Sequence, residues 1–291
     1  MPRAREPRAR QQRRGIKRAT RATIVLALLL TVGGYIALRH SVPVLEPSSC
    51  AAAARGQPIP LDVGQAAIAA TIAGVAHHHD LPPRAVTVAY ATALQESKLT
   101  NLRSGDRDSV GVFQQRPSEG WGPARRIEDP IYATTRFFGA LTQVPGYKNM
   151  PVYQAAQAVQ HSADGYAYSQ YASVAANMTK AFTGQLPHGV WCWYSTPVGQ
   201  PRLTAAGQAL TKAFGPLHVW RLGDPQLAIR VARPPAGWAV AAWLVSHAAS
   251  YGIQTVTYQG YQWVTKDGSS GWHRVKAGQH PKAPPAVVLF G

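Results

Sequence analysis

The segment 93–122, ALQESKLTNLRSGDRDSVGVFQQRPSEGWG, decides how we interpret the chain. It begins inside an apolar run that keeps helical spacing over about residues 84–97. Glu96 lies three residues after Ala93 and seven after Ala89, so the three share the inward face of that helix. A lone carboxyl group at the end of an apolar helix face needs an explanation.

The surroundings of Glu96 predict a chemistry. Apolar neighbours withhold solvation from the charged carboxylate, and the helix C-terminus presents partial negative charge, so both disfavour the charged form. A carboxyl group that keeps its proton near neutral pH suits a general acid that protonates a glycosidic oxygen. The alternative is a partly exposed glutamate that merely ends a helix.

Three elements follow each other in this segment and carry a resemblance: Glu96-Ser97, then GDR at 105–107, then GVFQ at 111–114. The apolar alternation at 110–113 predicts a short β excursion after the helix. This order resembles the signature of the lysozyme-like superfamily of soluble lytic transglycosylases and goose-type lysozymes. With DPIYATTRFFGAL at 129–141, it resembles more closely an actinobacterial branch of membrane-anchored or secreted transglycosylase-like proteins. The resemblance covers about residues 60–185.

The resemblance implies a role for each matching residue. Glu96 matches the family's catalytic acid, whereas Ser97 and Gln114 are expected to bind substrate in the sugar cleft. Asp106 matches the second carboxylate of the goose-type enzymes, which helps to place or activate water, and Asp108 is the substitute candidate. Either aspartate could instead be an ordinary turn residue.

The sequence also departs from the family pattern. Arg116 stands where the goose-type enzymes have a further acid, and Gln160 and His161 stand where the transglycosylases have Tyr-Asn. Tyr168 matches a tyrosine of the closer branch and is expected to supply the missing phenol to the substrate site. These differences leave hydrolysis and transglycosylation open, since a transglycosylase needs no second carboxylate.

The predicted fold class is α+β. We expect a mainly helical lysozyme-like domain with a small β excursion and, after a linker, a small C-terminal α+β module. In that module, 237–251 is expected to be an amphipathic helix whose Trp238 and Trp243 could bind glycan or simply pack, and Gln259-Gly260 to join two strands. The predicted boundaries are a basic tail at 1–21, a transmembrane helix at 22–38, linkers at 39–60 and 196–214, the lysozyme-like domain at 61–195 and the module at 215–291.

The N-terminal region suggests a location. Residues 22–38, ATIVLALLLTVGGYIAL, form 17 uncharged residues, near the minimum for a membrane-spanning helix. Nine Lys and Arg residues precede them within 1–21, so the positive-inside rule predicts a cytoplasmic N-terminus and an extracytoplasmic remainder. A cleaved signal peptide is the alternative. Because the adjacent span explains the basic tail, we expect no nucleic-acid partner.

Cysteine content and composition complete the prediction. Cys50 and Cys192 are the two cysteines of the chain, and on the extracytoplasmic side we expect a disulfide between them. A catalytic thiol is less consistent, because Cys192 has no basic neighbour that would activate it. No metal or cofactor is expected. In the segment from Asp106, Val110 and Pro117 replace the fifth and twelfth ligands of a calcium loop. The adjacent histidines 77–79 point in different directions.

We therefore expect a protein of the cell membrane that cleaves peptidoglycan glycan strands with Glu96 as the acid. The alternative is a catalytically inactive wall-binding or assembly protein that keeps the same fold. Intact Glu96, Gln114 and Asp106 favour the enzyme, while Arg116 and the altered Tyr-Asn segment favour the inactive protein.

Overall fold

A computed structural model describes residues 24–35, 47–54, 56–162, 164–223, 225–275 and 286–291. The chain divides into two compact units, residues 1–46 and residues 47–291. The predicted cytoplasmic tail at 1–21 lies outside the described residues.

The predicted transmembrane helix at 22–38 is wrong. Within the described residues the helix covers 24–35, and no described helix has the length and apolar character needed to cross a membrane. The described helical residues 24–35 extend about 18 Å, whereas the hydrocarbon core of a bilayer is about 30 Å thick. The flanking residues 22–23 and 36–38 lie outside the described part of the chain.

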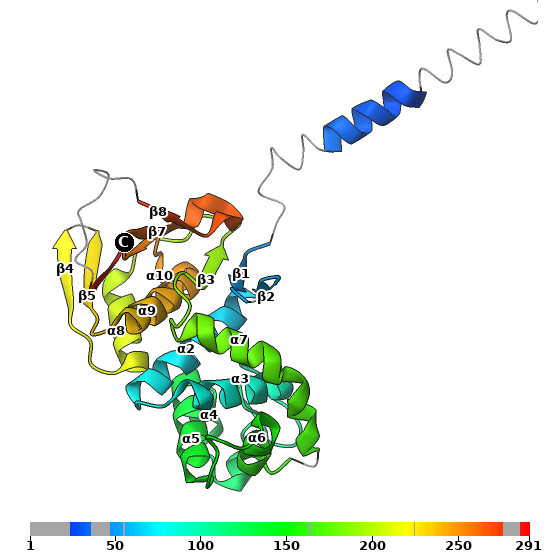
Figure 1. Cartoon of the computed structure of the whole chain (residues 1–291), viewed down its shortest axis with the longest axis vertical. Coiled ribbons are helices and arrows are strands. Elements are labelled where there is room, and N and C mark those ends of the chain that lie inside the picture. The colour runs from blue at the N-terminus through cyan, green and yellow to red at the C-terminus, as the bar shows by residue number, and fades with distance from the viewer. Residues whose placement is uncertain (1–23, 36–46, 55, 163, 224, 276–285) are drawn as a thin grey trace, which may run out of the picture. The chain divides into compact units, whose positions relative to one another are not determined.

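Helix α2, Val63–His78, is the central element of the larger unit. Its residues Ala66 and 69–76 are buried, which surrounds the helix with protein. It contacts α3, α5 and α7 on one side and α8 and α9 on the other, as Figure 1 shows. A helix that is apolar on all sides is suited to such a position. One hydrophobic cluster therefore extends through both groups of helices.

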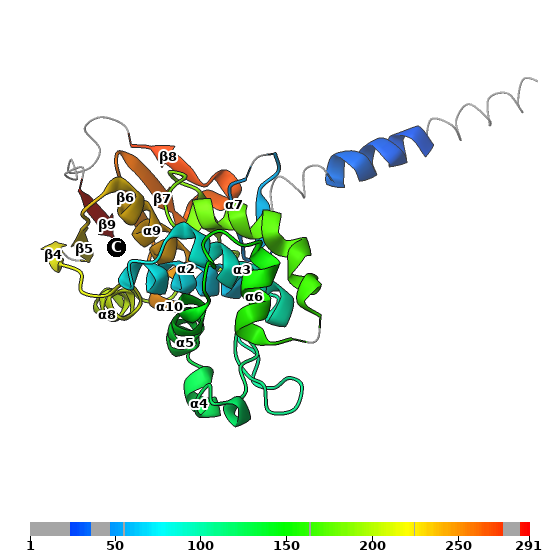
Figure 2. The ribbon, with the colours of Figure 1, turned by 60° about the horizontal axis from the view of Figure 1, so that its bottom comes forward.

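The helices that carry the candidate site gather beside α2, opposite the larger sheet (Figure 2). Helix α3 is buried along nearly its whole length and packs against α6 and α7. The segment 98–123, between α3 and α4, projects from this group of helices and lies next to α4 (Figure 2). Their bounds are α3 Pro83–Ser97, α4 Ala124–Ile127, α5 Pro130–Gln143, α6 Val152–Gln160 and α7 Ala172–Phe182, with 3-10 helices η2 Pro117–Glu119 and η3 Gly165–Tyr171.

Two antiparallel sheets complete the unit. The smaller has the order β2-β1-β3, and Cys50 lies directly opposite Cys192 in the pairing of β1 with β3. The predicted disulfide Cys50–Cys192 is confirmed and joins these strands. Its strands are β1 Ser49–Ala52, β2 Ile59–Leu61 and β3 Val190–Trp193.

The larger sheet has the order β4-β5-β9-β6-β7-β8 and packs against α9. Its strands are β4 Val219–Gly223, β5 Gln226–Arg230, β6 Thr255–Tyr258, β7 Tyr261–Val264, β8 Trp272–Arg274 and β9 Val287–Phe290. The helices beside it are α8 Leu203–Phe214, α9 Pro234–Ser246 and α10 Ala248–Tyr251, and the 3-10 helix η4 covers Thr265–Ser270.

Several local predictions can be compared with these elements. Gln259 and Gly260, both with positive φ, join β6 to β7 as the hairpin prediction required. Trp238 and Trp243 are 3% and 2% exposed, so they belong to the core and the amphipathic assignment of their helix is wrong. The predicted linker at 196–214 contains α8, and the linker at 39–60 contains β1. The structure is mixed α+β, while the division of residues 61–291 into two domains stays a prediction.

Candidate functional site

The end of helix α3 fixes the position of Glu96. The helix is buried from Ala85 to Ala93, and it stops where Lys98 and Leu99 adopt left-handed backbone conformations, φ 55° and 58°. The Lys98 and Leu99 amides both donate to the Ala93 carbonyl, which closes the helix end. Leu99 is fully buried and anchors this turn. Glu96 is left half-buried in the last turn.

Tyr168 is the partner of Glu96. Its hydroxyl donates a hydrogen bond to Glu96 Oε1 at 2.6 Å, and its ring is 1% exposed. Burial, followed by the hydrogen bond to Glu96, raises the pKa of Tyr168 far above its usual value, so the phenol keeps its proton and remains a donor at neutral pH. Glu96 Oε2 has no hydrogen-bond partner among the described residues. One carboxyl oxygen is therefore held and the other is available.

Ser97 attaches the following loop to the helix end. Its buried Oγ lies 2.7 Å from the Val112 carbonyl and 3.1 Å from the Ala93 carbonyl, and it accepts from the Thr100 amide. A hydroxyl has one proton, and the shorter contact is the one to Val112. The hydroxyl thus contacts backbone groups of the loop, and its expected substrate contact stays a prediction.

The predicted β excursion consists of two isolated bridges rather than strands. Leu102 pairs with Gly111, and Val110 pairs with Gln115. A tight turn replaces the predicted hairpin strands because Gly111 and Gln114 both have positive φ, which an extended strand does not allow. The segment is a compact loop fixed at its base.

Gln114 folds back onto this loop. Its Nε2 donates to the Gly111 carbonyl and its Oε1 accepts from Ser109 Oγ, each at 3.0 Å. A Cβ on Gly105 would lie 1.7 Å from Gln114 Oε1, so only glycine allows this arrangement at 105. The amide of the expected cleft glutamine is therefore engaged within its own loop.

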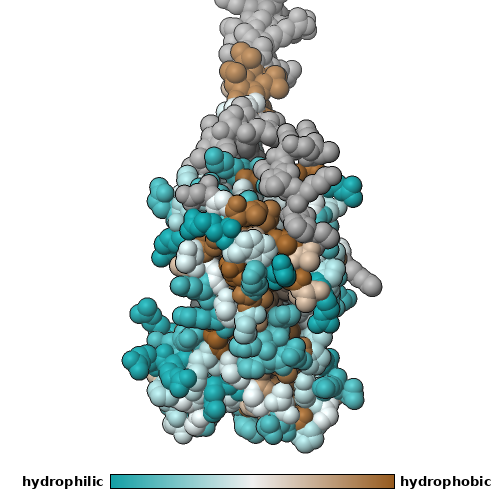
Figure 3. Space-filling view, turned by 90° about the vertical axis from the view of Figure 1, so that its left-hand side faces the viewer, coloured by the Kyte–Doolittle hydropathy of each residue, from teal (hydrophilic) through white to brown (hydrophobic). Residues whose placement is uncertain are grey.

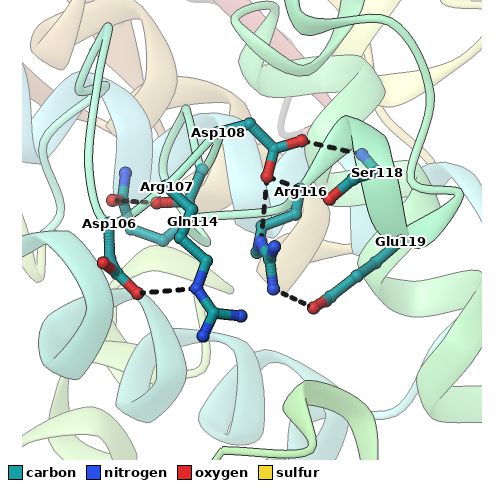
Figure 4. A network of polar contacts seen from close by, with 8 residues as sticks. Asp106, Arg107, Asp108, Gln114, Arg116, Ser118 and Glu119 are labelled. Atoms are coloured by element: carbon teal, nitrogen blue, oxygen red, sulfur yellow. Dashed lines mark hydrogen bonds and ion pairs between the residues drawn. The ribbon is translucent and has the colours of Figure 1, made fainter.

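The two candidate carboxylates differ in their surroundings, as Figure 4 shows. The side chain of Asp106 is 95% exposed, and its Oδ2 lies 4.0 Å from Arg107 Nε. Asp108 instead accepts from the Ser118 amide at 2.8 Å and from Arg116 Nε at 2.9 Å. The Ser118 amide first, and then the Arg116 guanidinium, lower the pKa of Asp108 to about 2.

Arg116 and Gln160, two of the departures from the family pattern, hold the loop in place. Arg116 bridges Asp108 and Glu119 and so closes the loop on itself (Figure 4). Gln160 Nε2, at the end of α6, donates to the Phe113 carbonyl at 2.8 Å. Sequence reasoning missed both as structural contacts, although their place in the family motifs marked them as unusual.

A groove of about 660 Å³ opens beside this loop. The ends of α5 and α6 form its walls, and Gln160 and His161 lie at the edge next to the loop. Within the described part of the chain, no group of three or more His, Cys, Asp or Glu residues is placed to hold a metal ion. Hydrogen bonds join Tyr168 to Glu96 and Ser97 to the loop, but none of these three residues lines the groove. Asp106 is exposed to solvent.

Comparison with known proteins does not assign the chain to a family. No protein-family model matches the chain, and no curated protein matches it significantly.

Proposed function

We propose that this protein cleaves the glycan strands of peptidoglycan outside the cytoplasm, with Glu96 as the general acid. The carboxyl group of Glu96 carries the proposal, because it is half-buried at a helix end. Its Oε1 accepts a hydrogen bond from Tyr168, and its Oε2 is available to contact a substrate. The Cys50–Cys192 disulfide supports an oxidising, extracytoplasmic location.

In this proposal Glu96 protonates the oxygen that bridges the N-acetylmuramic acid and N-acetylglucosamine units. Tyr168 orients the carboxyl group, because a buried phenol with a fixed hydrogen bond restricts its rotation. The loop that follows α3 is held at both sides, by Ser97 on the Val112 carbonyl and by Gln160 on the Phe113 carbonyl. A rigid loop beside the acid is suited to position a sugar.

The placement of the aspartates favours transglycosylation over hydrolysis. An inverting hydrolase needs a second carboxylate that holds water opposite the acid. Asp106 is almost fully exposed, and Asp108 is committed to Ser118 and Arg116, so neither is held as such a base. We therefore favour attack by the muramoyl sugar's own hydroxyl on its anomeric carbon. The bridging C–O bond breaks, the leaving oxygen takes the proton of Glu96, and the attacking hydroxyl returns its proton to Glu96.

A second candidate is a wall-binding protein without catalytic activity. It is favoured by Gln114, whose side chain is engaged within its own loop rather than offered to a ligand.

The test incubates the full-length chain with purified peptidoglycan and analyses the products by mass spectrometry. We expect anhydro-muramoyl ends. Glu96→Gln should lower cleavage at least about 100-fold, since it keeps the shape of the side chain but has no proton to donate. Glu128→Gln, a half-buried glutamate at the end of α4, is the matched control and should cleave normally. Asp106→Asn should also cleave normally.

Each other outcome has a defined meaning. Reducing ends, together with a severe loss in Asp106→Asn, would indicate a hydrolase. Binding of intact glycan without products would favour the inactive protein. Unchanged cleavage by Glu96→Gln would refute the role of Glu96.

A further inference from the structure

A second surface lies away from Glu96, between helix α8 and strand β4. Two adjoining grooves of about 570 and 380 Å³ share Thr204, Arg221 and Leu227 as lining residues. Leu217, Val219 and Leu227 make much of the larger groove apolar. Figure 3 shows this side of the molecule, where hydrophobic residues run down the middle with hydrophilic residues on either side.

Strand β4 forms an edge of the larger sheet. Among the described strands it pairs only with β5. The amide of Arg230 donates to the His218 carbonyl, so these two residues form a hydrogen-bonded pair. Along an antiparallel ladder, hydrogen-bonded pairs alternate with pairs that are not hydrogen-bonded. In the register that places Val219 opposite Ile229, the backbone amide and carbonyl of Val219 therefore point away from β5. Val219 therefore offers these two backbone groups to a further strand beside an apolar groove.

The charged side chains that line the two grooves are all basic. Residues 196–291 contain nine Lys and Arg residues but only Asp224 and Asp267 as acids, a net charge of +7. Lys212 lines the larger groove and Arg202 lines the smaller one, and no carboxylate is found among the lining residues of either groove. An occupant with negative charge is therefore favoured over a neutral or basic one.

We propose that this groove binds an extended acidic peptide segment of a partner protein, which adds to β4 as a further strand. In strand addition, main-chain hydrogen bonds give affinity and pockets for alternate side chains give specificity. The segment that fits has apolar residues on the face toward Leu217 and Leu227 and acidic residues near Lys212. This binding is separate from glycan cleavage and does not depend on Glu96.

The apolar lining and the outward amide and carbonyl of Val219 favour a peptide over an acidic polysaccharide. A polysaccharide has no amide groups in register with a β-strand, so it would use the charge and leave the edge unpaired. The two ligands therefore predict different effects on the backbone of β4.

The test measures fluorescence anisotropy of a labelled octapeptide of alternating glutamate and valine with the full-length chain. Val219→Pro removes the outward amide of the edge, a position at which proline is tolerated in sheets. Lys212→Glu reverses the charge in the groove, and Lys180→Glu, at an exposed position of α7, is the matched control. Since the basic segment 1–21 is the same in all variants, differences between them report on the groove.

We expect binding to weaken at least about tenfold in Val219→Pro and Lys212→Glu, and less than about twofold in Lys180→Glu. Amide hydrogen exchange should slow in residues 217–223 when the peptide binds. Circular dichroism shows whether Val219→Pro folds. If it does not fold, the weaker binding of Lys212→Glu alone tests the proposal.

Three results would overturn the proposal. The first is absence of binding at millimolar peptide. The second is equal weakening by Lys180→Glu, or equal binding of a peptide with serine in place of valine, because either would indicate general charge attraction. The third is peptide binding that does not slow amide hydrogen exchange in β4. If polyphosphate also displaces the peptide, the groove would be a site for an anionic polymer.

Discussion

Replacing Tyr168 with phenylalanine tests how Glu96 is held. Phenylalanine keeps the buried ring and removes only the hydroxyl that donates to Glu96 Oε1. Hydrogen bonds to charged groups contribute about 1.5–3 kcal/mol, so a loss of this contact in the transition state corresponds to about a 10- to 150-fold fall in cleavage. At neutral pH the free energy of unfolding should fall by only about 1 kcal/mol, because Glu96 is half-buried and water can replace the phenol.

Alkaline pH gives the same variant a second, independent signature. Tyrosines of the unfolded chain ionise near pH 10, whereas burial and the contact with Glu96 raise the pKa of folded Tyr168 above that value. Above pH 10 the folded state therefore binds more protons than the unfolded state, and the stability from Tyr168 decreases by about 1.4 kcal/mol per pH unit. Tyr168→Phe lacks this contribution, so its disadvantage relative to the wild type should shrink above pH 10 and then reverse.

The assay is urea unfolding followed by circular dichroism at several pH values from 8 to 11, together with glycan cleavage at neutral pH. The pKa values of Tyr90 and Tyr194 are also raised by burial, but both residues are present in wild type and variant and cancel in the difference. Tyr166→Phe is the control, since that side chain is 68% exposed. A stability difference that does not change with pH, or cleavage equal to the wild type, would refute the assigned role of Tyr168.

Three further predictions concern the framework of the site. Reduction of Cys50–Cys192 should lower the melting temperature, because the bond closes a loop of 142 residues and contributes about 5 kcal/mol in the chain-entropy model; an unchanged melting temperature would contradict this. Asp108 has its pKa lowered to about 2 by Ser118 and Arg116, so its stabilising contribution is complete above pH 3.8 and is lost as the pH falls toward 2. Pepsin should therefore cut residues 103–120 of the wild type only near pH 2, and those of Asp108→Asn already at pH 4. Gly184→Ala should lower the free energy of unfolding by more than about 2 kcal/mol in urea titrations, since its φ is 71° and the new Cβ would lie 2.0 Å from the Pro235 carbonyl oxygen; a neutral effect would show that this contact adjusts easily.

Local signals in the sequence account for the starts of two helices around the site. Pro82-Pro83 and Asp129-Pro130 mark the starts of α3 and α5, and Asp129 accepts from the Ile131 amide as a helix cap should. The hairpin at Gln259-Gly260 was predictable for the same reason, because its turn chemistry is local. These elements depend on residues close together in the chain.

The elements that depend on distant partners were not predicted. The segment VVLF at 287–290 gave no signal beyond its apolar character, yet β9 is buried on both faces between β5 and β6. A continuous apolar run of four residues fits a buried strand and a buried helix segment equally well. Within the site, the loop that holds Gln114 needed Gly105 and Ser109 at specific distances, which no linear pattern shows.

Helix α2 connects the candidate site to the region that carries the proposed peptide groove. Ala70, Ala73 and Gly74 are too small to fill space themselves, and Gly74 faces the ring of Phe214 at the end of α8 so closely that a Cβ there would lie 2.7 Å from a ring carbon. A helix that is apolar on every side cannot leave one side in water without losing the free energy of that burial, about 25 cal/mol for each Å² exposed. Removal of residues 203–291 would uncover the face of α2 that contacts α8 and α9. The helices that position Glu96 therefore depend on the C-terminal region for their fold, even though the two proposed activities use separate residues.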